Sequence, residues 1–315
     1  MGNVMQKIVV VGSLNMDVVI ETPHMPERGE TISGRKIDLV SGGKGANQAY
    51  ALGKLGGDVT MIGAVGKDAA GEAILESLRS VNVNVEGIRQ MEDGTTGQAF
   101  IAVDDDGDNS IIIIAGTNGM VTKELIDEKA DIIRESDIVI MQFEIPLEVV
   151  EYVKEMAVKE GKTVIVDPAP AVPGLPEHFW NGIDYIKPNE TELAILTGMK
   201  MNTREELVKG ARVMIGKGVK NVIVTLGKEG CLMVTEDTEE FFCPYKVKAL
   251  DTTAAGDSFT AAFALALSQG KTYGEAVSLG QKVSSIAVTR KGAQTSIPTL
   301  EEVKTIWDER KEIIT

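Results

Sequence analysis

Short apolar runs alternate with helical stretches along most of this chain, and that alternation limits the folds it can adopt. Residues 7–13 (KIVVVGS) and 58–66 (DVTMIGAVG) read as strands, and each is followed by a helical segment. The same alternation resumes at residues 137–142 (DIVIMQ) and continues to residues 221–227 (NVIVTLG). Fully apolar strands between helices predict an α/β fold with a mostly parallel central sheet covered on both faces. Ligands of such sheets bind beyond the carboxyl ends of the strands, so the loops after strands are the places to search.

Two segments break this alternation and predict a separate small β-sheet. Residues 17–43 contain two short β-like runs around a Pro/Gly turn, and residues 97–119 read as a hairpin around Asp106-Gly107. Residues 111–114 are four consecutive isoleucines, which favours coverage of both faces by a partner or a closed lid.

These segments set the expected domain organisation. We expect residues 15–41 and 96–118 to form a lid or an oligomer interface, with an inert surface sheet as the alternative. The α/β body then comprises residues 1–14, 42–95 and 119–315.

Composition and missing motifs exclude several classes of function. The 315 residues carry a net charge of −15, which argues against nucleic acid as a partner. No G-x-x-x-x-G-K-[ST] loop occurs, GSLNMD does not match the dinucleotide fingerprint, and two histidines give poor support to a His-based triad or metal site.

The N-terminal region and the cysteines bear on location. The N-terminal apolar run is broken by Asn15 and Asp17, so it predicts a strand rather than a membrane span or signal peptide. Cys231 and Cys243 are expected to be reduced, buried thiols, with a disulfide as the alternative. Reduced thiols and the N-terminal run together predict a cytoplasmic protein without a membrane partner.

A Gly-rich segment, residues 41–48 (SGGKGANQ), precedes a predicted helix. Bare backbone there can approach a small polar ligand closely, while Lys44 and Asn47 supply hydrogen bonds. Asn15 and Asp17 follow the first strand and suit the hydroxyl groups of a sugar. The alternatives are a Gly-rich turn for the first segment and a strand-ending turn for the second.

Residues 251–259 (DTTAAGDSF) read as a small-residue loop that leads into the helix TAAFALALSQG. Ala254, Ala255 and Gly256 keep side chains away, so backbone N–H groups can stabilise charge on a transferring phosphoryl group. Asp257 then reads as the base that accepts the proton of an attacking hydroxyl. Alternatively, its carboxylate only interacts favourably with the helix dipole.

Two further loops follow strands and give weaker signals. Residues 225–230 (TLGKEG) could wrap phosphates with backbone N–H groups, or form an ordinary hairpin. Residues 187–192 (KPNETE) open a helix, where Asn189 fits an N-cap as well as a ligand.

At GGKGANQA and DTTAAGDSF the chain resembles the ribokinase / phosphofructokinase-B family of carbohydrate kinases, from VVGSLNMD to TRKGAQTSIP. The resemblance implies a three-layer α/β/α body and a β-sheet lid that often also forms a dimer. It also implies transfer of the ATP γ-phosphate to a primary hydroxyl, which for ribokinases is O5 of D-ribose. Sibling kinases act on fructose, deoxyribose or a nucleoside such as adenosine, and a non-catalytic sugar sensor is a further alternative.

The resemblance also implies roles for individual residues. The sugar-binding positions are Asn15, Asp17, Gly43, Lys44, Asn47, Glu144 and Asp257. Asp257 matches the catalytic base, and Ala254, Ala255 and Gly256 match the anion hole. The nucleotide and phosphate positions are Asn189, Thr225, Gly227, Gly230 and Gly256, with Glu192 matching an element associated with Mg²⁺ through water.

A potassium site near the anion hole is the last feature that the resemblance implies. Asp251 and Ser296 would contribute side chains, and carbonyl groups would come from Thr253, Ala287, Arg290 and Gly292. Oxygen ligands suit K⁺, and a cation there would help to order the adjacent loop. The alternative is a structural turn within residues 289–296.

Overall fold

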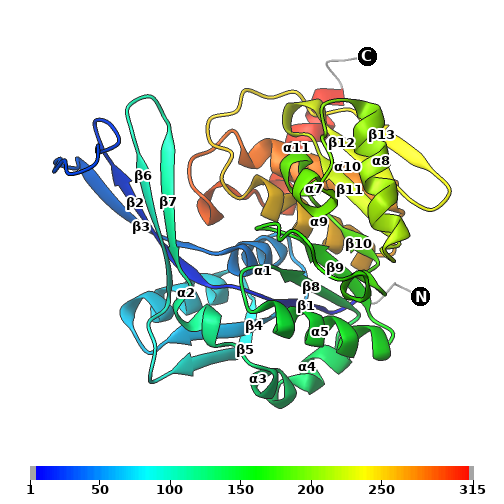
Figure 1. The fold of residues 1–315 in the computed structure, drawn as a ribbon, viewed down its shortest axis with the longest axis horizontal. Helices are drawn as coiled ribbons and strands as arrows, with labels where there is room; N and C mark the ends of the chain where they lie inside the picture. Colours follow the sequence, from blue (N-terminus) through cyan, green and yellow to red (C-terminus); the bar gives the residue numbers. More distant parts are fainter. Residues whose placement is uncertain (1–4, 312–315) are drawn as a thin grey trace.

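One nine-stranded sheet runs through the computed structural model, which describes residues 5–311 (Figure 1). From edge to edge its strands are β13 (Glu239–Phe242), β12 (Cys231–Val234), β11 (Asn221–Thr225), β10 (Tyr185–Ile186), β9 (Thr163–Asp167), β8 (Ile138–Gln142), β1 (Ile8–Val11), β4 (Val59–Gly66) and β5 (Asn84–Met91). Neighbours from β11 to β5 pair in parallel, whereas β12 and β13 are antiparallel additions at one edge. The predicted α/β fold with a mostly parallel sheet is confirmed.

Helices cover both faces of the sheet and give three layers. One face packs against α1 (Lys44–Lys54), α2 (Ala69–Ser80), α9 (Ala255–Ser268), α10 (Tyr273–Ala287) and α11 (Leu300–Lys311). The other packs against α3 (Lys123–Glu128), α4 (Ala130–Glu135), α5 (Leu147–Lys159), α6 (Glu177–Trp180), α7 (Glu190–Thr197) and α8 (Arg204–Gly216). Each face of the sheet therefore has its own hydrophobic core. Successive residues of β1 point into these cores alternately: Ile8 and Val10 belong to the core with α1 and α9, and Val9 and Val11 to the core on the other face.

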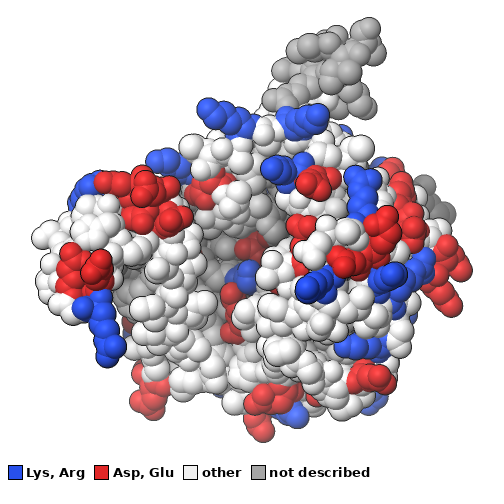
Figure 2. All heavy atoms as spheres, turned by 45° about the horizontal axis from the view of Figure 1, so that its top comes forward, with Lys and Arg blue, Asp and Glu red and all other residues white. Residues whose placement is uncertain are grey.

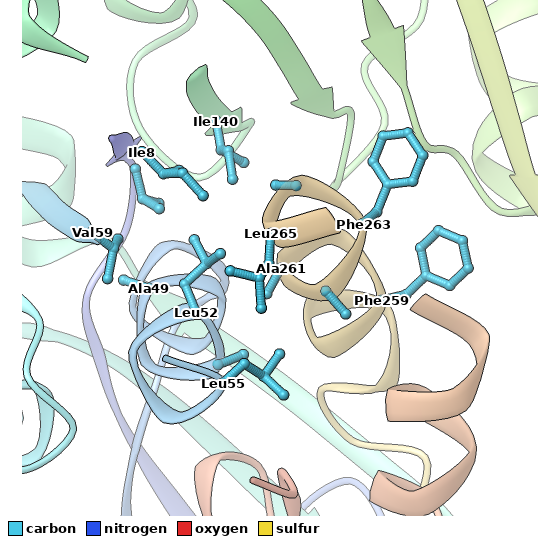
Figure 3. Packing of buried hydrophobic residues seen from close by; sticks show 14 of the residues in the cluster. Ile8, Ala49, Leu52, Leu55, Val59, Ile140, Phe259, Ala261, Phe263 and Leu265 are labelled. Carbon is cyan, nitrogen blue, oxygen red and sulfur yellow. The ribbon is translucent and has the colours of Figure 1, made fainter. Parts of the chain in front are cut away.

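Helices α1 and α9 pack against each other in the first core. Ala49 and Leu52 of α1 lie beside Ala261 and Leu265 of α9, and all four side chains are fully buried (Figure 3). Alanines at this contact allow the helices to approach closely. Their N-terminal ends therefore lie together, although the two helices are about 200 residues apart in the sequence.

The second sheet stands to one side of the body (Figure 1). Its order is β3 (Lys36–Gly42), β2 (Asn15–Glu21), β6 (Gly97–Val103) and β7 (Asn109–Ile114). The hairpin around Asp106-Gly107 forms as predicted, with Val103 paired to Asn109. In this single chain Ile111 to Ile114 are 50–66% exposed.

Some expectations were wrong in detail. Helix α9 begins at Ala255, so residues 255–259 are its first turns and not part of a loop, because Gly256 and the small residues around it fit a helix start. Strand β5 lacks a continuous apolar run and was not predicted. Cys243 is exposed, because it follows the edge strand β13, whereas Cys231 is buried.

Residues 1–4 and 312–315, which the sequence assigns to the body, lie outside the described residues. Among helices of residues 5–311, none combines the length and apolar character required to cross a membrane.

Candidate active site

A cavity of about 960 Å³ opens at the carboxyl ends of the central strands. Asp167 ends β9, Thr225 ends β11, and both line the cavity. Figure 2 shows a hollow in this face of the molecule, with acidic and basic side chains at its base. Besides Thr225, the predicted site residues that line the cavity are Lys44, Asn189, Glu192, Gly227, Gly230, Ala254, Ala255, Gly256 and Asp257.

The N-terminus of α9 forms one wall of this cavity. Ala254 precedes the helix in the left-handed conformation (φ 57°), and no side chain caps the helix. Gly256 keeps the first turn bare, since a Cβ there would lie 3.2 Å from the Lys187 ammonium. Uncapped backbone N–H groups next to a buried lysine can hold an anion.

Asp257 lies in that first turn and is 6% exposed. Its Oδ2 accepts a hydrogen bond from Asn47 Nδ2 at 3.1 Å, and its Oδ1 accepts one from Gln48 Nε2 at 3.0 Å. Burial raises the pKa of Asp257, and the nearby Lys44 ammonium opposes that rise. The result is a buried carboxylate, held from two sides, at the mouth of an anion-binding helix end.

The predicted sugar-binding residues gather between this helix and the second sheet. Glu144 Oε2 accepts hydrogen bonds from Ser13 Oγ at 2.5 Å and from the Lys44 backbone N–H at 3.0 Å. Asn118 Nδ2 donates to Asn15 Oδ1 at 2.7 Å. These bonds join the end of β1, the start of α1 and the segment after β7 into one polar cluster.

Gly43 allows the chain to enter α1 beside that cluster. Its φ is 85°, and a Cβ at this position would lie 2.8 Å from the Asn15 backbone nitrogen. Both the backbone conformation and the close approach therefore require glycine.

Several carboxylates lie close together in this polar cluster, and both burial and neighbouring charges shift pKa values there. Burial raises the pKa of Asp17 to about 7, with further contributions from Glu144 and Asp257. Burial alone would lower the pKa of Lys44, but carboxylates led by Asp257 raise it above its ordinary value. Lys44 is therefore a fixed positive charge among negative ones.

The predicted nucleotide residues lie on neighbouring loops of the same cavity. Asn189 caps α7 in a capping box with Glu192, and it bridges to Thr225 at the end of β11. The turn from Gly227 to Gly230 joins β11 to the antiparallel strand β12, so this loop is a hairpin that also lines the cavity. Asn189 is an N-cap, and its position leaves it on the cavity wall.

The structure joins part of the predicted potassium site. Asp251 Oδ1 accepts from the Thr253 N–H at 2.9 Å, and Oδ2 accepts from the Gly292 N–H at 2.8 Å, so Asp251 links two loops. The Ala287 carbonyl accepts from the Arg290 N–H at 3.0 Å, and Ser296 Oγ donates to the Ala293 carbonyl at 2.7 Å. The candidate ligands at this site are a carboxylate, a hydroxyl group and backbone carbonyls, all of them oxygen donors.

Three buried side chains at the site, Gln48, Asp167 and Lys187, are not among the residues that the sequence predicts for it. Gln48 Nε2 donates to Asp167 Oδ2 at 2.9 Å as well as to Asp257, and Lys187 Nζ lies 3.3 Å from Asp167 Oδ2. Asp167 and Lys187 could have been found, because each stands at the carboxyl end of a predicted strand. Gln48 stands inside the Gly-rich segment, but nothing in the sequence shows that it faces Asp257.

Comparison with known proteins agrees with this geometry. The model of the pfkB family carbohydrate kinases matches residues 5–300. A ribokinase of Haemophilus influenzae is 38% identical over 94% of this chain and 96% of its own length, and a deoxyribokinase of Salmonella typhi is 36% identical over the same shares. The structure of Arabidopsis thaliana ribokinase with ribose and ATP superposes with a TM-score of 0.91 at 35% identity, covering 96% of this chain and 99% of that one. The chain therefore belongs to the pfkB family of carbohydrate kinases, and it is a ribokinase-like sugar kinase.

Proposed function

We propose that this enzyme transfers the γ-phosphoryl group of Mg-ATP to the O5 hydroxyl of D-ribose, giving D-ribose 5-phosphate and ADP. One observation carries the proposal. Asp257 is a buried carboxylate held by Asn47 and Gln48 in the first turn of α9, where the helix N-terminus faces a cavity of about 960 Å³. This arrangement provides a base and an anion-binding site within one helical turn.

In the proposed reaction, Asp257 accepts the proton of the attacking hydroxyl while the new O–P bond forms. The bond between the γ-phosphorus and the bridging oxygen of ADP breaks, and ADP leaves with the electron pair. The backbone around Ala255 and Gly256, together with Lys44, stabilises the charge on the transferring group. Because these groups are held before the reaction, little reorganisation is required.

The acceptor is held in this proposal by the polar cluster beside β2 and α1. Its members are Asn15, Asp17, Gly43, Lys44, Asn47 and Glu144. Amide groups and carboxylates of this kind suit the several hydroxyl groups of a pentose. The nucleotide in this proposal lies along Asn189, Thr225, Gly227 and Gly230, which line the cavity together with Lys44.

The residues present suit the two cations of the proposal, Mg²⁺ and K⁺. Asp167 Oδ1 is buried without a hydrogen-bond partner, and Glu192 lines the same cavity, so both suit a hydrated Mg²⁺ held with the nucleotide. When bound, Mg²⁺ neutralises phosphate charge. We also propose K⁺ as an activator, held by Asp251 and the carbonyl-rich loop at residues 287–296, which would order the chain that enters α9.

The second sheet is proposed to act as a lid and as a homodimer interface. Ile37, Leu39 and Ile111 to Ile114 leave apolar side chains at least half exposed on it. Closure would exclude water from the phosphoryl donor, and pairing of two such sheets would cover the isoleucines on one face of the sheet.

The test is ADP formation by purified enzyme with Mg-ATP and a panel of acceptors: D-ribose, 2-deoxy-D-ribose, D-fructose and adenosine. The proposal requires D-ribose to give the highest kcat/KM. Since a deoxyribokinase is among the relatives, deoxyribose is the important competitor. A preference for deoxyribose would retain the chemistry and overturn the proposed acceptor, whereas no acceptor-dependent ADP from the folded protein would overturn the kinase proposal.

A further inference from the structure

Gln48 occupies a special place beside Asp257. It is fully buried on α1, and its Nε2 donates to two carboxylates, Asp257 Oδ1 at 3.0 Å and Asp167 Oδ2 at 2.9 Å. A primary amide has two N–H donors, so both are used. Asp257 and Asp167 are thus linked through one neutral side chain.

Gln48 is itself held in place. Its Oε1 accepts a hydrogen bond from Gln142 Nε2 at 2.7 Å, and Gln142 is also fully buried, at the end of β8. Gly12 leaves room for that side chain, since a Cβ at Gly12 would overlap the Gln142 amide oxygen. Ionised carboxylates only accept hydrogen bonds, so the N–H groups of Gln48 face Asp257 and Asp167, and its Oε1 is left to accept the bond from Gln142.

From these contacts we infer that Gln48 is a positioning residue for the base Asp257, and that Gln142 orients it. The inference rests on the proposed function, in which Asp257 accepts the proton of the acceptor hydroxyl. Gln48 fixes the rotation of the Asp257 carboxylate through Oδ1. It also places an N–H donor where two negative groups would otherwise face each other in a buried site.

Other charges act on Asp257 from the surrounding elements. Lys44 on α1 attracts it, while Asp167 at the end of β9 repels it. It also interacts with Asp17 on β2 and Glu144 after β8, and Lys187 balances Asp167 from the loop after β10. Gln48 differs from all of these because it has no titratable group, so its contribution is constant with pH.

The test compares wild-type enzyme with Gln48→Met, which keeps side-chain length and removes the donors. We expect kcat to fall at least about tenfold with a much smaller change in the acceptor KM, because the base is misplaced while the sugar ligands remain. We also expect the acidic limb of kcat/KM to move up by about one pH unit, since the charged form of Asp257 loses a hydrogen bond.

Gln294→Met is the matched control. Gln294 is another buried amide of this region, and it donates to Asn47 Oδ1 at 3.3 Å but to neither carboxylate. We expect it to affect the acceptor KM and to leave the acidic limb in place. The inference would be overturned if Gln48→Met kept the wild-type kcat and an unmoved acidic limb of kcat/KM. It would also be overturned if Gln294→Met moved the acidic limb by the same amount as Gln48→Met.

Two measurements cover the remaining outcomes. If Gln48→Met does not fold, the same pH profile is measured on Gln142→Met. The acidic limb of kcat/KM is then expected to move up by a smaller amount, and an unmoved limb would contradict the inference. If the wild-type enzyme phosphorylates none of the acceptors, carbon-13 NMR of labelled aspartate, assigned with Asp257→Asn, follows the Asp257 carboxyl directly. Its titration midpoint must lie higher in Gln48→Met, so failure of the inference is distinguishable from failure of the proposed function.

Discussion

The side chains of Asn47 and Asp257 meet at 3.1 Å although 210 positions separate them in the sequence. Asn47 belongs to α1, the first helix of the body, and Asp257 to α9, a helix near its end. The packing of α1 against α9 brings them together, because buried alanines and leucines hold the two helices in contact (Figure 3). The fold therefore joins the proposed sugar ligands to the proposed base.

Replacing Gly43 tests the geometry of the sugar loop. Gly43→Ala is expected to lower the free energy of unfolding by about 2–4 kcal/mol and to raise the acceptor KM, because a left-handed φ and a close contact with Asn15 both oppose a side chain. Gly29→Ala is the matched control, since Gly29 has a φ of 86° with no atom within 4 Å of its Cβ position. It should cost only about 1 kcal/mol. Equal losses in denaturant unfolding would contradict the role assigned to the contact.

Asp17 predicts a pH dependence of stability. Its pKa is raised from 3.8 to about 7 in the folded protein, so ionisation favours the unfolded state as pH rises between these values. Asp17→Asn should therefore stabilise the protein by up to about 4 kcal/mol at pH 8, with the gain vanishing below about pH 4. Thermal unfolding across this range provides the measurement, and a gain that is greatest at low pH would refute the assignment. The same variant should bind D-ribose more weakly.

The exposed isoleucines predict an interface on the second sheet. Ile112→Lys places a charge on the edge strand β7, so it should shift a wild-type dimer toward monomer. Light scattering after size-exclusion chromatography gives the masses. Val158→Lys is the control, because Val158 is 41% exposed on α5, in the body. A wild-type monomer, or dissociation by both variants alike, would remove the proposed interface.

Asp251 connects the proposed potassium site to α9. Asp251→Asn should abolish most of the stimulation of kcat by K⁺, because the proposed cation loses its anionic ligand. Activity without added K⁺ should be less affected. Titration with KCl, NaCl and LiCl at constant ionic strength separates specific activation from screening. Undiminished K⁺ stimulation in the variant would show that the cation binds elsewhere.

Much of the fold could be predicted because short stretches of sequence determine the strands and turns. Continuous apolar runs such as residues 8–11 can only be buried on both faces, and the Asp-Gly turn at 106–107 defines a hairpin. Strand β5 could not be predicted in this way, because it lies at the edge of the sheet and its side chains are largely polar or partly exposed.

The site was less predictable, because long-range packing determines which side chains meet. Ala254 to Asp257 were recognised as a group because they are contiguous. Gln48 and Asp167 are 119 positions apart, and their contact depends on the order of β8 and β9 in the sheet and on how α1 packs over it. No pattern within either segment encodes that contact.

The role of Asp257 as the base is tested most directly by the rate of ribose-dependent ADP formation in Asp257→Asn, with ribose binding measured by calorimetry on the same sample. Glu275→Gln is the matched control, because Glu275 holds the corresponding third position of α10 and is not part of the cavity wall. Loss of a general base predicts a fall in kcat of about a thousandfold in Asp257→Asn, with ribose still bound and near-normal activity in the control. A kcat within about threefold of wild type would contradict the assignment of Asp257 as the base.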